Sequence, residues 1–274
     1  MRNLNGNIIF MKNENNLLNY SYAKLISKLI KLGHLHNYSS KLIGEEIFGK
    51  TGLIYPLYRF TINPTAKAKF CIIAGVHGYE IAGPLTMPAL FANPKKYLNK
   101  KICYYVYPVI NPTAFDLRRR LDDDGYDLNT LNKKILKNKG FREIQAFYQD
   151  IKNKKFEVLI SIHEDIDLNK FYAYIFEKEG NSIYRKIINS TRKYAEILNK
   201  NRIYGTPSDG KGLIINHHDQ SIEDRLYCKK QAKISLCTET PGRLNLSTRI
   251  SINLNNIQIL NTYILKQIKN NIAT

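Results

Sequence analysis

Three segments of the sequence place histidine or glutamate directly after a run of apolar residues. The run CIIAG leads to His77 and Glu80, the run VLISI leads to His163, and the run ISLCT leads to Glu239. Two histidines and one carboxylate are a ligand set of catalytic zinc with an open fourth position. The residue types therefore predict a metal site with His77, Glu80 and His163 as ligands.

His77 and Glu80 form an H-x-x-E motif with Gly75 before it and Gly78 inside it. A spacing of three residues lets both side chains reach one point where the chain turns or begins a helix, and the glycines fit a tight turn close to a bound ion. The motif by itself equally describes a surface turn, and a histidine after a strand is usually structural. Only the combination with His163 favours a metal site, and such a set also occurs around iron.

Hydrolysis at a metal site needs a carboxylate that takes a proton from water and passes it to the leaving nitrogen. Glu239 is the candidate general base, although a glutamate in this place could simply end a strand. The polar segment at residues 111–129 carries Arg118, Arg119 and Arg120. A guanidinium near the metal could stabilise an oxyanion, but an exposed loop with compensating charges would have the same composition.

The elements that must position these residues are predicted from hydrophobic periodicity. Nearly continuous apolar runs, typical of strands covered on both faces, predict strands at residues 53–61, 70–74, 102–109, 158–162 and 234–238. Helical spacing predicts helices at residues 17–32, 81–91, 141–151, 182–198 and 257–268. This alternation favours an α/β fold, a three-layer sandwich around a mixed, mostly parallel sheet, in which polar residues at strand ends converge.

The chain has 274 residues, of which 43% are hydrophobic, and shows no internal repeat or linker. We therefore expect a single domain over residues 1–274, with residues 1–50 as an N-terminal helical extension packed on it. No run approaches the ~18 apolar residues of a membrane span, and the N-terminus lacks the features of a secretory signal. These observations predict a cytoplasmic protein with no membrane partner. The four cysteines include no C-x-x-C pair, so neither a disulfide framework nor a cysteine zinc site is expected.

The net charge of +19 comes from 42 lysines and arginines against 23 acidic residues. A basic surface attracts anionic partners, which would suit an acidic substrate. The lysines are scattered rather than interleaved with aromatic residues, so a nucleic-acid partner is not favoured. The pair His217-His218 has no third ligand at useful spacing in the sequence and is interpreted as part of a loop.

Taken in order, these motifs resemble the zinc carboxypeptidase family and its amidase and deacylase relatives. The matching residues are His77-Gly78-Tyr79-Glu80, Asn111-Pro112, Arg120, Asp127-Leu128-Asn129, His163 and Glu239. The resemblance implies a zinc carboxypeptidase-like fold and one zinc ion per chain, held by the two histidines and Glu80. It also implies that Glu239 is the general base and that Arg120 binds the oxyanion, with Arg118 or Arg119 as alternatives.

The resemblance implies further roles around the metal. Asn129 would help to bind the terminal carboxylate of a substrate, and Tyr204 could correspond to a mobile tyrosine of relatives. Asp127 could accept the second ring N–H of a ligand histidine, and residues 171–174 could line the pocket.

The sequence departs from its relatives at Thr130. They usually carry an arginine there, which binds the substrate carboxylate through two hydrogen bonds. Arg243 or Arg249 could replace this arginine, or the substrate could lack the carboxylate.

The expected activity is therefore hydrolysis of an amide or peptide bond by a metal-activated water, as in a carboxypeptidase or peptide amidase. An alternative within the same superfamily is deacylation of an N-acyl amino acid, as in succinylglutamate desuccinylase and aspartoacylase. A third possibility, from a different class, is a non-catalytic protein that binds an anionic polymer through its basic surface. The expected partner is a peptide or N-acyl amino acid, with an acidic one favoured by the charge of the chain.

Overall fold

A computed structural model describes residues 20–44, 52, 54–130, 142–177 and 183–270. Within these residues eight strands form one sheet in the order β1-β2-β4-β3-β5-β10-β6-β9. The strands of this sheet are β1 (Ser39–Gly44), β2 (Leu57–Ile62), β3 (Ala68–Ala74), β4 (Ile102–Tyr107), β5 (Phe156–Asp165), β6 (Tyr172–Phe176), β9 (Leu213–Ile215) and β10 (Ala232–Pro241). A separate short pair consists of β7 (Arg202–Ile203) and β8 (Thr206–Pro207).

The four central strands, β4, β3, β5 and β10, are mutually parallel. On one side β2 and β1 are added antiparallel, and on the other side β6 is antiparallel to β10, with β9 parallel to β6. The prediction of a mixed, mostly parallel sheet is thus confirmed. Parallel strands need long crossover connections, which explains the alternation of strands and helices along the chain.

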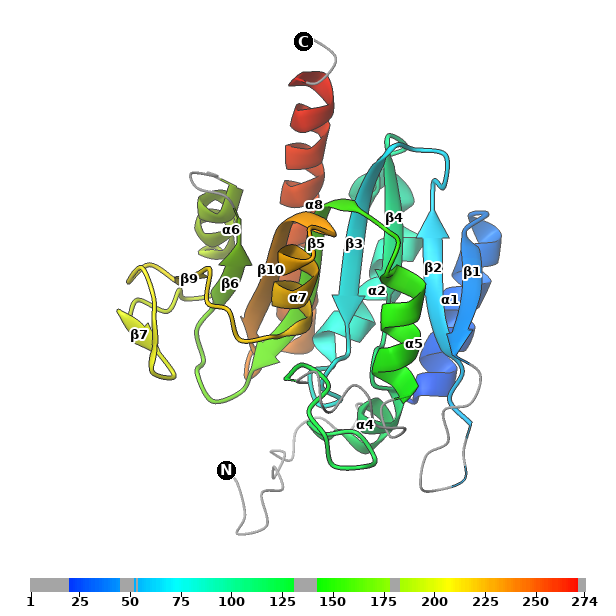
Figure 1. The fold of residues 1–274 in the computed structure, drawn as a ribbon, viewed down its shortest axis with the longest axis horizontal. Coiled ribbons are helices and arrows are strands. Elements are labelled where there is room, and N and C mark those ends of the chain that lie inside the picture. The colour runs from blue at the N-terminus through cyan, green and yellow to red at the C-terminus, as the bar shows by residue number, and fades with distance from the viewer. Residues whose placement is uncertain (1–19, 45–51, 53, 131–141, 178–182, 271–274) are drawn as a thin grey trace.

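Helices cover both faces of the sheet, as Figure 1 shows with α5 and α7 in front of it. The buried side chains of β3 divide between two core clusters: Phe70 and Ile72 lie in one, and Cys71 and Ile73 in the other. The first cluster includes residues of α1 (Tyr22–Leu35), α2 (Ala82–Ala92), α6 (Ile183–Thr191) and α8 (Leu246–Asn270). The second includes residues of α5 (Arg142–Ile151) and α7 (Ile222–Cys228). The three-layer prediction is confirmed.

Each predicted strand and helix has a counterpart, with shifted ends. Leu53, Phe141, Ser182 and residues 17–19, which fall in four predicted elements, lie outside the described residues. The helix predicted at 182–198 ends at Thr191, and the one predicted at 257–268 is only the second half of α8. The first half of α8 was not predicted because it buries polar residues: Arg249 pairs with Glu164, and Asn253 contacts Thr240.

Of residues 1–50, which were expected to form an N-terminal helical extension packed on the domain, the structure describes residues 20–44. Leu25 and Leu29 of α1 lie in the main core, and β1 pairs with β2 as the edge of the sheet. The segment from α1 to β1 is therefore part of the sandwich itself. Two short helices, α3 (Pro94–Tyr97) and α4 (Pro112–Leu117), complete the described elements. Among these helices, none is long and apolar enough to cross a membrane.

Candidate active site

The candidate residues gather at the carboxyl ends of three adjacent parallel strands. His77 follows β3, His163 lies near the end of β5, and Glu239 lies near the end of β10. The register pairs Glu239 with His163 directly. Parallel neighbours end at the same edge of a sheet, so three segments that are distant in the sequence meet at one point.

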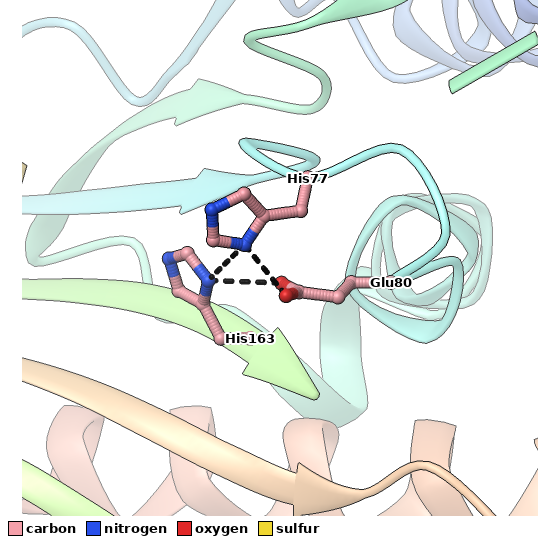
Figure 2. Close-up of side chains that lie close together, drawn as sticks. All are labelled: His77, Glu80 and His163. Atoms are coloured by element: carbon pink, nitrogen blue, oxygen red, sulfur yellow. Dashed lines mark hydrogen bonds and ion pairs between the residues drawn. The ribbon is translucent and has the colours of Figure 1, made fainter. Parts of the chain in front are cut away.

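The side chains of His77, Glu80 and His163 converge on one another, as Figure 2 shows. Nδ1 of His77 lies 2.6 Å from Oε1 of Glu80, and Nδ1 of His163 lies 2.8 Å from Oε2 of the same carboxylate. The two Nδ1 atoms are 3.3 Å apart. All three residues are at most 2% exposed.

This arrangement fits a metal ion in two respects. Two nitrogens bound to tetrahedral zinc at ~2.0–2.1 Å would lie about 3.3 Å apart, which matches the separation of the two Nδ1 atoms. Oε2 of Glu80 is buried and has no hydrogen bond of regular geometry, and a buried carboxylate oxygen is costly without a partner. The Nδ1–carboxylate distances are those of direct ion pairs, shorter than the edge of a zinc tetrahedron.

Each histidine is held through its second ring nitrogen. Nε2 of His77 lies 3.0 Å from Oδ1 of Asp127, and Nε2 of His163 lies 2.9 Å from the hydroxyl of Ser161. Asp127 is fixed in turn by Nε of Arg120 at 2.8 Å. Hydrogen-bond partners in this position fix the orientation of a histidine ring, and here they leave both Nδ1 atoms facing the Glu80 carboxylate. The contact of Asp127 with His77 is the one that a supporting acceptor would make.

The ionisation of the cluster follows from these contacts. Burial by itself lowers the pKa of both histidines. The charge of Glu80 and the hydrogen bonds to Asp127 and Glu80 reverse this for His77 and raise its pKa. For His163, the charge and hydrogen bond of Glu80, together with the charges of Glu239 and Glu223, raise the pKa to about 10. Burial opposes ionisation of Glu80, yet the charges of His77 and His163 lower its pKa to about 2. Glu80 is therefore an anion at neutral pH, as a metal-binding carboxylate must be.

The Asn111-Pro112 motif holds the loop that carries His77. Nδ2 of Asn111 donates to the carbonyl of Val76, and its Oδ1 caps α4 by accepting from the N–H of Ala114. Gly78 lies against that helix, where a Cβ atom would come within 1.8 Å of the Ala114 carbonyl oxygen. Position 78 therefore requires glycine because the loop packs closely against α4. The sequence had suggested a different reason, the close approach of the backbone to an ion.

Glu239 lines a cavity of about 320 Å³ together with His77, Glu80 and His163. Burial, reinforced by the negative charges of Glu80 and Asp165, raises the pKa of Glu239 to about 8. The thiol of Cys237 is 3.6 Å from its Oε1. A carboxyl group that takes up a proton near neutral pH is suited to general acid–base chemistry.

Of the three consecutive arginines, only Arg120 lines this cavity. Its Nη1 lies 3.0 Å from the hydroxyl of Tyr79, which also lines the cavity. Arg119 instead pairs with Asp123, and Arg118 bonds to the carbonyls of Phe115 and Tyr20. The structure therefore does not bring the two alternative arginines to the site, because the chain turns at Arg118, which caps α4 in the left-handed region.

The remaining predicted substrate-binding residues reach the cavity in different ways. Asn129 lines it, but its Oδ1 accepts from the N–H of Ile222 and so holds the start of α7. Tyr204 stands at the cavity with 61% exposure, and its hydroxyl donates to Asp165 at 2.9 Å.

Two arginines proposed as replacements for the missing one do not line the cavity. Arg249 is buried and pairs with Glu164, 2.9 Å away, and Nε of Arg243 bonds to the carbonyl of Ile166. Thr130 does line the cavity, as do Tyr172 and Tyr174 of β6, which agrees with the expectation that this aromatic segment lies at the pocket.

The expectation that the pair His217-His218 has no third ligand at useful spacing is wrong for His218, because Asp224 and Cys228 lie close to it in space. Helix α7 presents Asp224 and Cys228 on one face, and His218 lies 2.7 Å from the Asp224 carboxylate. Asp224 also accepts from the Cys228 thiol and from the N–H of Gln220. These hydrogen bonds satisfy the cluster without an ion.

Sequence reasoning missed Ser161, Asp165 and Glu223 as parts of the site. Ser161 and Asp165 lie two residues before and after His163, on the same side of β5 because side chains alternate along a strand. That alternation was a usable signal. Glu223 offered none, since α7 was not predicted and its side chain reaches the cavity from a separate helix.

The fold and site together define a class: an α/β sandwich with a histidine–glutamate–histidine cluster at the edge of its parallel strands. No protein-family model matches the sequence, and no curated protein matches it. Among solved structures, the chain resembles a metallopeptidase candidate from Shewanella amazonensis SB2B, with a TM-score of 0.71 and 23% identity over 88% of this chain and 91% of that one.

Two further structures support the same fold. A metallopeptidase candidate from Shewanella denitrificans OS217 gives a TM-score of 0.72 and 19% identity, covering 86% of this chain and 88% of that one. A metallo-carboxypeptidase from Burkholderia cenocepacia gives a TM-score of 0.67 and 15% identity, covering 91% of this chain and 70% of that one. At these identities the likeness establishes a metallo-carboxypeptidase-like fold.

Proposed function

We propose that this protein is a zinc-dependent hydrolase that cleaves an amide bond, with His77, Glu80 and His163 as the metal ligands. The observation that carries the proposal is the convergence of both Nδ1 atoms on one buried carboxylate. The likeness to structures described as metallopeptidases supports the same activity class. Zinc is preferred to iron because the resemblance is to zinc enzymes.

The chemistry divides between the ion and the chain. A zinc ion held by His77, Glu80 and His163 would polarise a carbonyl oxygen and make water more acidic. Glu239 takes the proton of the attacking water and gives it to the leaving nitrogen, a role that its raised pKa supports. Arg120 directs its guanidinium at the cavity, where it stabilises the negative charge that develops on the carbonyl oxygen.

The contacts of Arg120 keep it in place for this role. Asp127 and the Tyr79 hydroxyl hold two sides of the guanidinium at 2.8 and 3.0 Å. A donor that is already oriented does not have to reorganise when charge develops on the substrate. Asp127 connects the two functions, because the same carboxylate also holds Nε2 of His77.

Metal content tests the proposal first. Purified protein is expected to contain about one zinc ion per chain by elemental analysis, and His77→Ala is expected to lose it. Hydrolysis of peptide and N-acyl amino acid substrates, compared between the zinc-loaded protein and Glu239→Gln, tests the catalytic step. Absence of metal even after zinc is supplied would contradict the proposal and leave the basic surface as the leading clue to function.

A further inference from the structure

The charge of the cavity is opposite to the charge of the protein. Among the residues that the structure describes, seven of the chain's 23 acidic residues line the cavity, against one of its 42 lysines and arginines. That one, Arg120, is already bonded to Asp127. His77 and His163 also line the cavity and have raised pKa values, so the acidic residues outnumber the cationic ones by seven to three. A cavity in which one sign of charge predominates concentrates ligands of the opposite sign.

Several of these carboxylates are accounted for. Glu80 and Glu239 belong to the proposed metal and catalytic chemistry, and Glu164 is neutralised by Arg249 at 2.9 Å. Three further carboxylates carry the argument: Asp165, Asp219 and Glu223. They come from the end of β5, the segment that leads into α7, and the first turn of α7.

Glu223 is the most informative of them. Its side chain is 1% exposed and lines the cavity, and neither carboxylate oxygen makes a hydrogen bond of regular geometry, although the Cys237 thiol interacts with this carboxylate. The closest cationic group, Nε2 of His163, is 3.7 Å away and already bonds to Ser161 at 2.9 Å. Burying a carboxylate that accepts no hydrogen bond of regular geometry is costly, and the approach of His163 at 3.7 Å offsets that cost only in part, because Glu80 shares the same imidazole. A further positive partner from outside the chain would therefore stabilise Glu223.

Asp165, which also lines the cavity, supports the same conclusion. It is 8% exposed, and its carboxylate accepts from the hydroxyls of Tyr172 and Tyr204 and from backbone N–H groups. All these donors are neutral, so its negative charge is oriented but not cancelled. At the exposed mouth, Asp219 adds a further carboxylate, whose Oδ1 accepts from the N–H of Ser221.

The same cavity is poorly equipped for a carboxylate. The position at which carboxypeptidase relatives usually have a carboxylate-binding arginine is Thr130, and it lines the cavity. Of the described arginines, neither Arg243 nor Arg249 replaces it, because neither lines the cavity.

We propose that this cavity binds amide substrates through a positively charged group, an ammonium or guanidinium, held by Glu223, Asp165 and Asp219. The inference rests on the proposed function, because the bound cation is a substrate only if the protein is a hydrolase. It replaces the expectation of an acidic substrate, which came from the net charge of the chain, with that of a basic one. The basic surface and the acidic cavity act at different places, and the carboxylates that line the cavity away from the metal ligands act on a bound substrate at the shorter range.

Matched ligands test the proposal. The ligands are the Nα-acetylated forms of argininamide and citrullinamide, which have nearly the same shape, and with the α-amine blocked only argininamide carries a positive charge. Calorimetric titration into zinc-loaded Glu239→Gln protein, in which turnover is suppressed, is expected to give at least tenfold tighter binding of argininamide. Glu223→Gln in that background should reduce this preference to less than threefold while citrullinamide affinity and zinc content stay unchanged. Asp219→Asn, an exposed substitution with little risk to folding, should reduce it partly.

Equal or tighter binding of citrullinamide would overturn the proposal, as would a preference that survives both substitutions or no detectable binding of either ligand. Tighter binding of a glutamate amide than of argininamide would also contradict it. Because the carboxylates concerned are not metal ligands, the same titration in zinc-depleted protein separates the two hypotheses. A preference for the cation there, without zinc binding or hydrolysis, would support the cation site and reject the hydrolase.

Discussion

Glu239 and His163 are direct neighbours across the parallel pair β10 and β5. This register places the proposed general base beside a proposed ligand on the more rigid part of the fold, at the ends of two central strands. Sites built on strands hold their geometry more closely than sites built on loops. Replacement of Glu239 is therefore expected to affect the catalytic step while leaving the proposed metal ligands in place.

Replacement of Glu239 by glutamine should separate metal binding from catalysis. Glutamine keeps the shape but cannot accept the proton of water, so amide hydrolysis is expected to fall by about 10²–10⁴-fold. Zinc content should stay at one ion per chain. Glu157→Gln, which removes a surface ion pair with Lys233 on the same two strands, is the matched control and should leave the rate unchanged. Undiminished hydrolysis in Glu239→Gln would assign the base elsewhere.

Asp127→Asn should weaken zinc binding rather than abolish it. The carboxylate accepts Nε2–H of His77 and pairs with Arg120, and loss of such a supporting carboxylate typically reduces metal affinity by about 10–100-fold. Competition with a chelator measures the affinity. Glu196→Gln, which alters an exposed ion pair with Lys170, serves as control. Unchanged affinity would mean that His77 does not need this acceptor.

Gly78→Ala should damage the site through packing alone. The new Cβ atom would meet the backbone of Ala114 at 1.8 Å, so the His77 loop or α4 must move. We expect a loss of about 3 kcal/mol or more in unfolding free energy, at the upper end for overpacked positions, together with loss of zinc. Gly33 lies in helix α1, and a Cβ atom there would be 3.8 Å from its nearest neighbours, atoms of Phe60 and Tyr38. The stability of Gly33→Ala should therefore stay level or rise by up to ~1 kcal/mol. Urea denaturation compares the two variants.

The contacts of Asp150, which does not line the cavity, predict that the free energy of unfolding falls in acid. It is nearly buried and binds Arg59 at 2.7 Å, Lys41 at 2.9 Å and the Tyr107 hydroxyl at 2.9 Å, tying α5 to β1 and β2. Burial alone would raise the pKa of Asp150, but these partners hold it below its ordinary value. The unfolded chain therefore binds the proton more readily than the folded one.

The sign of the pH dependence follows. The stabilisation by Asp150 is fully present above the ordinary pKa of an aspartate and is lost as the pH falls through the lowered folded-state value. At neutral pH, Asp150→Asn should cost about 1.5–3 kcal/mol, and the difference from wild type should shrink in acid. Urea unfolding of wild type and Asp150→Asn, at neutral pH and in acid, measures this difference in unfolding free energy. A difference that is independent of pH would exclude ionisation as its source.

Much of this architecture could be predicted from local patterns in the sequence. The apolar runs that became β3, β5 and β10 are continuous because both of their faces are buried, and a continuous run is visible without knowing its neighbours. Residues that follow such runs lie at the carboxyl ends of parallel strands. That rule sufficed to select His77, His163 and Glu239 as neighbours before any coordinates.

The tertiary structure decided the rest, and the charge of the cavity is the clearest case. Net charge is a sum over the whole chain, so it suggested an acidic ligand, whereas the field in a cavity depends on the few groups that face it. Glu223 reaches the cavity from α7, a helix too short and too polar to be predicted, and Arg118 and Arg119 turn away because the chain reverses at the end of α4. Side-chain direction at such places is set by contacts between distant segments, which no local pattern of residues encodes.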